Sequence, residues 1–556
     1  QVRFAVEAVS SSAAWCPAKS VAMASSDDED DFDDSDDEDD EDSESELDDA
    51  GHTAFARAAA TRSVGGTNGG AKSFVAQLRE DLKAAPFNEE LHIALVGALR
   101  EAADLDRLNT ARREAAARIA LPEDLWLEWL QDERRLASAA DDEVAALERL
   151  HAAACAAWPT ARTWLARCAL RVAVADAETQ DAGGQAAASS SAAAARARAA
   201  FEEALAILGA HPAEGPEVWA EFREFEMGLL AKTQGNPQAQ KQQAQRVRAL
   251  FMRQLALPLP GADRLRDALA SFEGGLEEAA RSASAAAKAE ALAAAVAGAW
   301  QERAALESRL QEASRPSVTV GPADTSDEKS ATPATVAAEI LALEEASGDR
   351  GRILVGHLRA TGSAPKEASR WRCFAEFHSS AQEHQRAAEV LERAVRHCAR
   401  CGDLWLQLHC EGEGAGASVE ALRDVLERGL LALRSAPEKS QESEAHAQEL
   451  LLQHADACRR AVQNLPKGQD PVELLAEMRA TFERAVGSAV AAGSDAGYSS
   501  QALLHWMRVE AYAVRDYKAT VQVGNRLMKL WGAYYNGWSS FIAAVRHSTT
   551  TDVYAT

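Results

Sequence analysis

Large apolar residues recur every three or four positions over most of the chain, in segments separated by short polar turns. The segment LPEDLWLEWLQDERRLA (121–137) shows this pattern well, because Trp126, Trp129 and Leu130 recur at helical spacing and Pro122 falls near the first turn, where proline is tolerated. A period near 3.6 residues predicts amphipathic helices. Runs of alternating apolar and polar residues, typical of strands, are sparse. The pattern therefore predicts an all-α chain of helices joined by short turns.

Tryptophan marks the first helix of each expected helix pair. Trp371 and Trp405 are 34 residues apart, and we interpret the 101 residues from Trp405 to Trp506 as about three such periods. A second large apolar residue often follows three positions later. The signature positions are Trp126, Trp129, Trp164, Trp219, Phe222, Trp371, Phe374, Trp405, Trp506 and Trp538. Tryptophans can be platforms for base stacking, but their recurrence on the inward helix face predicts that these pack between the two helices of a pair.

The second helix of each expected pair has a signature of its own. A large apolar residue is followed, three positions later, by a small one that leaves room for a neighbouring backbone. The sequences are FEEAL (201–205), FMRQL (251–255), LERAV (391–395), LERGL (426–430) and FERAV (482–486), of which FMRQL lacks the small residue.

This two-part pattern, at a period of about 34 residues, resembles the HAT (half-a-TPR) repeat of RNA-processing proteins over roughly residues 85–545. The resemblance implies an all-α, HAT/TPR-like solenoid in which helix pairs stack into a curved superhelix. Changes in composition divide the array into two blocks. The expected regions are a disordered acidic N-terminal region (1–72), an N-terminal block (74–311), a linker (312–333), a C-terminal block (334–547) and a tail (548–556).

The charge of the chain is concentrated near its N-terminus. Residues 25–49 hold 18 acidic and no basic residues, whereas the whole chain has a net charge of -27 and the remainder therefore only -9. Like charges with little to bury predict disorder. Met23 opens MASSDDEDD, a typical start, so residues 1–22 are expected to be an upstream extension. The rest of the chain lacks the general basic footprint of a nucleic-acid module.

Other features of the composition exclude further classes of protein. The eight cysteines have no regular spacing, which suits a reducing compartment. No run of about 18 apolar residues predicts a membrane span. Neither a phosphate-binding P-loop nor a GxSxG or HExxH motif is found, so we expect neither catalysis nor a bound cofactor.

Two features resemble one family of HAT proteins, the U4/U6 snRNP recycling factors (the squamous cell carcinoma antigen recognised by T cells family). One is the acidic, serine-containing segment before the array. The other is the stretch 98–133, in which Leu121–Pro122 precedes an L-W-L-x-W-L-x-D-E helix at Leu125–Glu133. The resemblance implies a nucleoplasmic protein that acts in U4/U6 snRNP assembly during pre-mRNA splicing.

The resemblance also implies partners. These are splicing and snRNP proteins, U6 snRNA, ubiquitin-specific proteases, and a second copy of the chain bound through the C-terminal block. RNA contact in the family rests heavily on two RNA recognition motifs after the array, and this sequence contains no [KR]-G-[FY]-[GA]-F-V string. We therefore expect a non-catalytic scaffold that binds proteins, with weak or indirect contact to U6 snRNA.

Three other functions are compatible with helical repeats. Two lie within RNA processing: a HAT subunit of pre-mRNA 3′-end cleavage, and a HAT subunit of ribosomal RNA maturation. The acidic segment and the sequence of 98–133 disfavour both. The third is a TPR-type chaperone cofactor, whose clamp of Lys, Arg and Asn residues for peptide C-termini is not visible in the sequence.

Two candidate sites outside the repeat signature remain. Cys398 and Cys401 form a C-x-x-C with His397, His409 and Cys410 nearby in sequence, which could hold zinc if four ligands converged. The favoured interpretation is structural, with Cys398 on the apolar face of a helix that Gly402 ends. The second site is the acidic segment. Several of its serines are followed, three positions later, by an acidic residue, the pattern that casein kinase 2-type kinases prefer. The candidate phosphorylation sites are Ser25, Ser26, Ser35, Ser43 and Ser45.

Overall fold

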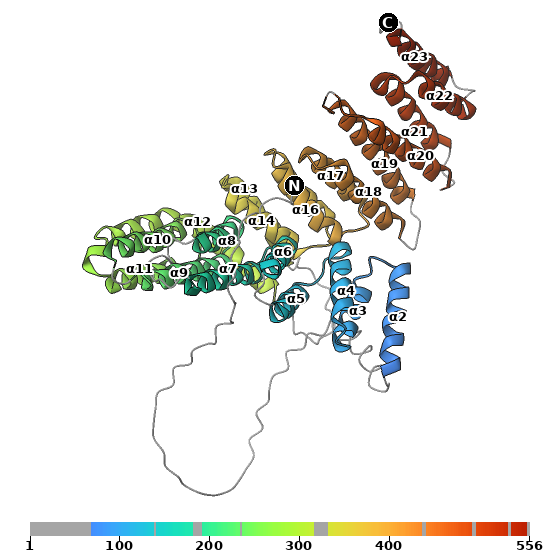
Figure 1. Ribbon diagram of the computed structural model, residues 1–556. Coiled ribbons are helices and arrows are strands. Elements are labelled where there is room, and N and C mark those ends of the chain that lie inside the picture. Colours follow the sequence, from blue (N-terminus) through green and yellow to red (C-terminus); the bar gives the residue numbers. More distant parts are fainter. Residues whose placement is uncertain are drawn as a thin grey trace, which may run out of the picture.

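The computed structural model describes residues 68–137, 141–181, 192–233, 236–315, 332–435, 441–466, 468–491, 496–531 and 535–552. Regular structure in these ranges is helical, and the α-helices pack in consecutive pairs (Figure 1). The all-α prediction is thus confirmed. None of the described helices is both long and apolar enough to pass through a bilayer. The acidic segment lies outside the described residues, as do its candidate serines Ser25, Ser26, Ser35, Ser43 and Ser45.

The helices of the first half end at α12, a long alanine-rich helix. Side-chain caps fix where some of these helices begin. The carboxamide oxygen of Asn88 caps α3 by accepting a hydrogen bond from the backbone N–H of Leu91, and the carboxylate of Asp104 caps α4 in the same way. The bounds are α2 (Asn68–Ala84), α3 (Glu89–Glu101), α4 (Leu105–Arg118), α5 (Glu123–Leu136), α6 (Asp141–Ala157), α7 (Ala161–Asp181), α8 (Ala192–Leu208), α9 (Gly215–Ala231), α10 (Pro237–Leu255), α11 (Ala262–Gly275), the 3₁₀ turn η2 (Glu278–Ala280) and α12 (Ala285–Ala313).

The helices of the second half form the staggered series that rises to the upper right of Figure 1. Their bounds are α13 (Pro333–Ser347), α14 (Arg350–Ser363), α15 (Ala368–Ser379), α16 (His384–His397), α17 (Gly402–Gly414), α18 (Val419–Arg434), α19 (Gln441–Gln463), α20 (Val472–Ala491), α21 (Ala496–Arg508), the π-helical turn η3 (Val509–Val514), α22 (Tyr517–Trp531) and α23 (Tyr535–Asp552).

The long interval between Trp405 and Trp506 spans two repeats, not three. Trp405 lies on α17 and Trp506 on α21, and the only intervening pair after α18 is α19 with α20. The prediction of about three periods was wrong because α19 and α20 have 23 and 20 residues, more than the helices on either side. α19 also has no tryptophan, and Leu450 and Leu451 fill the core there.

The signature aromatics pack in the core, as predicted, with one exception. Nine of the ten are at most 8% exposed, whereas Trp538 on α23 is 46% exposed. Several indole N–H groups also donate to the turn before their own helix: Trp371 to the carbonyl of Pro365 and Trp405 to that of Ala399, both at 2.8 Å. Each such tryptophan therefore fills the space between two helices and satisfies a carbonyl of the preceding turn. The core prediction fails at Trp538 because α23 is the last helix described, so no further helix covers its outer face.

The LWLEWLQDE segment forms α5, and its charged ending has a structural role. The rings of Trp126 and Trp129 stack on each other with centroids 5.3 Å apart. Asp132 pairs at 2.7 Å with Arg112 of α4, whose guanidinium is buried beside the Trp129 ring. Glu133 accepts the indole N–H of Trp129 at 3.2 Å. The tryptophans and acids of this motif thus join α4 to α5, and the rings are not available for a base.

A seam of ion pairs joins successive second helices. The glutamate at the second position of one [FL]-E-R-A motif pairs with the motif arginine of the next repeat, as Glu427 of α18 does with Arg484 of α20. The pairs, each with a closest approach of 2.6–2.7 Å, are Glu202–Arg253, Glu392–Arg428, Glu427–Arg484 and Glu483–Arg526. Three of these arginines also lie over the tryptophan of their own repeat: Arg253 over Trp219, Arg428 over Trp405 and Arg526 over Trp506. Because largely exposed ion pairs stabilise little, the seam chiefly fixes the register between repeats.

The second half begins beside the first. α14 packs against α8 and α16 against α6, so helices far apart in sequence are neighbours (Figure 1). The ring of His397 on α16 stacks on Trp371 and meets the edge of Trp158 at 5.7 Å. The two predicted blocks therefore share an interface, and their boundary at 312–333 stays a prediction, since residues 316–331 are outside the described ranges.

Buried ion pairs hold the helices on both sides of this boundary together. Glu344 of α13 is fully buried and receives two guanidinium groups, from Arg303 of α12 at 2.9 Å and from Arg352 of α14 at 2.6 Å. Glu307 of α12 forms a two-pronged pair with Arg359 of α14. Buried ion pairs thus join three helices on the two sides of the predicted linker.

Candidate functional site: a polar cavity between α18, α19 and α20

A cavity of about 560 Å³ opens between α18 and α20, with α19 behind it. Four acidic side chains and two arginines line it, together with His454 and a few apolar residues. The charged members are Glu420, Arg423, Asp470, Glu473, Glu477 and Arg484. The acidic excess suits a cationic ligand better than an anionic one.

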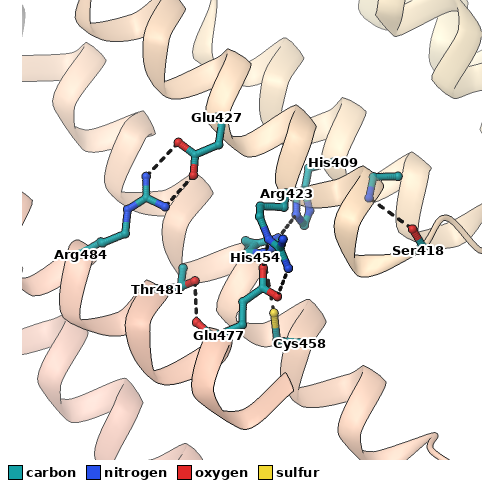
Figure 2. A network of polar contacts seen from close by, with 10 residues as sticks. His409, Ser418, Arg423, Glu427, His454, Cys458, Glu477, Thr481 and Arg484 are labelled. Carbon is teal, nitrogen blue, oxygen red and sulfur yellow. Dashed lines mark hydrogen bonds and ion pairs between the residues drawn. The ribbon is translucent and has the colours of Figure 1, made fainter. Parts of the chain in front are cut away.

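Crossed ion pairs form the wall where α18 faces α20 (Figure 2). Arg423 and Glu427 lie one turn apart on α18, and Glu477 and Arg484 lie two turns apart on α20. Arg423 donates to both carboxylate oxygens of Glu477 from Nε and Nη2, and Arg484 donates to both oxygens of Glu427 from Nη1 and Nη2. Each helix thus presents one cation and one anion to the other. The Arg484 pair belongs to the seam, and the Arg423 pair adds a contact peculiar to this repeat.

A chain of buried polar groups runs inward from this wall. Glu477 Oε1 lies 3.0 Å from His454 Nε2, and His454 Nδ1 lies 3.1 Å from Nε2 of His409 on α17. Cys458, one turn after His454 on α19, places its sulfur 3.7 Å from the same Nε2 atom. His409, His454 and Cys458 are fully buried. Helices α17, α19 and α20 therefore each contribute to one continuous network (Figure 2).

Burial keeps both imidazoles of this network neutral at physiological pH. It lowers the pKa of His409 to about 4, helped by the neighbouring His454, and burial also lowers the pKa of His454 although Glu477 opposes that shift. Burial alone would raise the pKa of Glu477, but hydrogen bonds from Arg423 and His454 hold it below its usual range. The network thus contains a carboxylate paired with Arg423 and two neutral rings.

The arrangement is suited to binding and not to nucleophilic chemistry. Burial raises the pKa of the Cys458 thiol to about 12, so that the unreactive thiol predominates. His454 Nε2 is already engaged by Glu477, and the hydroxyl of Thr481, which also lines the cavity, donates to the backbone carbonyl of Glu477 at 2.9 Å.

The predicted cysteine pair lies elsewhere. Cys398 is the residue after α16 and its thiol faces the carbonyl of Pro365 at 3.5 Å, while Cys401 immediately precedes α17. Within the described part of the chain, neither belongs to a group of three ligand side chains close enough to share a metal ion, because the ring of His397 is turned onto Trp371. Burial and the neighbouring Cys401 raise the pKa of Cys398 to about 11.

Gly402 does not end α16, as the sequence suggested. α16 ends at His397, and Gly402 is the first residue of α17. Gly402 allows the backbone of α17 to lie close to α19, because a Cβ atom at this position would collide with the ring of His446 on α19. The glycine therefore lets α17 pack against α19, which no local helix-ending signal could have revealed.

Sequence reasoning missed the buried network. The one local signal is the H-x-x-x-C spacing of His454 and Cys458, which places both on one face of a helix. Glu477 comes from the next helix, and His409 was considered only with the C-x-x-C motif.

The comparisons with known proteins point to one kind of relative. Similar curated proteins carry the name spliceosome associated factor 3, U4/U6 recycling protein: the Mus musculus protein is 28% identical over 185 residues, the Homo sapiens protein 27% over 185, and the Danio rerio protein 32% over 196. The chain is distantly similar to U4/U6 recycling proteins. Each match covers 33% of this chain and 17–19% of the relative, so the chain matches less than a fifth of these relatives' length. No family model matches the chain.

Proposed function

We propose that the protein is a helical-repeat scaffold in the nucleus that takes part in U4/U6 snRNP recycling during pre-mRNA splicing. The observation that carries the proposal is the partial similarity to U4/U6 recycling proteins in a chain built from stacked helix pairs. Its mechanism is binding, because helix pairs stacked side by side offer extended surfaces to partner proteins. Splicing and snRNP proteins are the proposed partners, with U6 snRNA reached through them and ubiquitin-specific proteases as further candidates.

Recovery of snRNP components with the protein tests this function. An epitope-tagged full chain immunoprecipitated from nuclear extract of its own cells should enrich U6 and U4 RNAs above U1 RNA, because the proposed scaffold binds recycling complexes and not U1 particles. Quantitative reverse transcription of the three RNAs gives the ratio. Equal recovery of U6 and U1, at normal expression and with a folded protein, would contradict the proposal.

A second copy of the chain is the proposed partner of the C-terminal helices. Six large apolar side chains are exposed on α22, η3 and α23, the last elements that the structure describes. They are Tyr512, Tyr517, Leu530, Tyr535, Trp538 and Ile542. Exposed apolar clusters of this kind are typical of interaction sites.

Light scattering tests the dimer directly. The purified chain should have twice the monomer mass of 59.4 kDa, and Ile542→Asp should shift it to the monomer, since a charge on the covered face must be desolvated. Leu136→Asp, at a similarly exposed position on α5, is the matched control and should remain dimeric. A monomeric wild type at micromolar concentration, or two variants that behave alike, would count against this surface.

A further inference from the structure

Three side chains that commonly bind transition metals converge behind the cavity. His454 and Cys458 lie one helical turn apart on α19, and Glu477 reaches the same point from α20. One ligand atom of each lies within 4.8 Å of the other two, and among the described residues no other set of three or more His, Cys, Asp and Glu side chains meets this condition. The cluster comprises a nitrogen, a sulfur and an oxygen ligand.

The distances approach those of a tetrahedral zinc ion. Zinc bonds of about 2.0–2.3 Å place neighbouring ligand atoms about 3.4–3.6 Å apart. His454 Nε2 lies 3.0 Å from Glu477 Oε1 and 3.7 Å from Cys458 Sγ. These two separations lie within about 0.4 Å of that range.

Outer partners orient two of the three ligands, His454 and Glu477. His409 Nε2 faces His454 Nδ1 and holds the ring with Nε2 toward the cluster in either tautomer. Arg423 donates to both carboxylate oxygens of Glu477, from Nη2 to Oε2 and from Nε to Oε1, so Oε1 would bind the ion while it keeps the hydrogen bond from Nε. Metal-binding imidazoles and carboxylates usually have such outer partners, which orient them.

The charges also suit a divalent cation. Binding would displace the thiol proton of Cys458 into solvent. The proton of neutral His454 would move to Nδ1 and donate to Nε2 of His409, whose own proton would then be carried on its Nδ1 atom. A thiolate, a carboxylate and a neutral imidazole together neutralise Zn²⁺, so that Arg423 remains the counter-charge of the acidic cavity. Since His454 and Glu477 line the cavity, the fourth position would face it.

We propose that His454, Cys458 and Glu477 form a zinc-binding site that joins α19 to α20, with the fourth ligand position open to the cavity. A site with three protein ligands and an exchangeable fourth can also accept a donor group from a bound partner. The proposal does not depend on the splicing role.

Cobalt substitution tests the site. The full-length chain, stripped with a chelator and titrated with Co²⁺, should bind one equivalent and develop the thiolate-to-cobalt charge-transfer band together with tetrahedral d–d bands, which Zn²⁺ should then remove. Cys458→Ala should lose the charge-transfer band. Cys398→Ala is the matched control: it removes a cysteine of the neighbouring C-x-x-C and should leave the spectrum unchanged. His409→Gln should weaken metal binding about 10–100-fold, as outer partners typically do.

Each remaining outcome decides against the site. A wild-type chain without the charge-transfer band, or a band that survives Cys458→Ala, overturns the proposal, as does a band lost only in Cys398→Ala. If Cys458→Ala fails to fold by circular dichroism, X-ray absorption of the zinc-loaded wild type decides: one sulfur at about 2.3 Å among nitrogen and oxygen neighbours supports the site, and nitrogen and oxygen alone contradict it.

Discussion

Replacing Trp126 with alanine is expected to lower the free energy of unfolding by about 3–5 kcal/mol, the cost typical of truncating a buried aromatic ring. The ring is 4% exposed, stacks on Trp129 and packs between α4 and α6. Urea denaturation followed by the helical circular dichroism signal measures the loss. Hydrogen exchange should place it in α4–α6, because repeats of a solenoid open locally.

Two comparisons separate the contribution of packing from that of hydrogen bonding. The indole N–H of Trp126 has no hydrogen-bond partner, so Trp126→Phe should recover most of the stability lost in the alanine variant. Trp405→Phe should cost more, because it removes the bond to Ala399. Trp538→Ala, at the half-exposed position, should cost under about 1 kcal/mol. If Trp126→Ala keeps the stability of the wild type, the ring is not part of the core.

Replacing Glu344 with glutamine is expected to destabilise the protein by about 3–5 kcal/mol, because it removes the buried carboxylate that Arg303 and Arg352 share. Arg303 then keeps only Glu307, which Arg359 also binds. Burial already lowers the pKa of Arg303, which indicates how unfavourable this charge is without its partners. The variant should unfold at lower urea concentration, and hydrogen exchange in α12–α14 should rise.

The matched control lies on the same helix. Glu339 of α13 also pairs with an arginine of α12, Arg309, but both side chains are nearly half exposed. Glu339→Gln should cost under about 1 kcal/mol, since exposed pairs contribute little. Equal effects of the two substitutions would show that burial does not determine the strength of this junction.

Most of the fold follows from local sequence. The segment 121–137, whose apolar spacing predicts a helix, forms α5 (Glu123–Leu136), and the LERAV motif (391–395) lies on α16. The apolar period and the repeated motifs suffice for these assignments because both depend on neighbours along one helix. The interval from Trp405 to Trp506 was misread because a period cannot reveal that α19 and α20 are longer than their neighbours.

The candidate site was much less predictable. His454 and Cys458 could be placed on one helix face from their spacing, but Glu477 joins them only because α20 packs against α19. Gly402 was assigned to a helix end when its function is to admit the ring of His446. Both depend on contacts between helices, which single-chain patterns do not encode.

Two helix pairs of the seam, α17–α18 and α19–α20, carry both a glutamate and an arginine end. A helix pair such as α17–α18 offers Glu427 to the repeat that follows and Arg428 to the repeat that precedes it. Duplicating or deleting one whole pair would therefore regenerate matching ends at the new junction, without any compensating substitution. The array could therefore lengthen or shorten by whole helix pairs. The pair α19–α20 has no tryptophan but carries both charges, so this matching does not require the aromatic core signature.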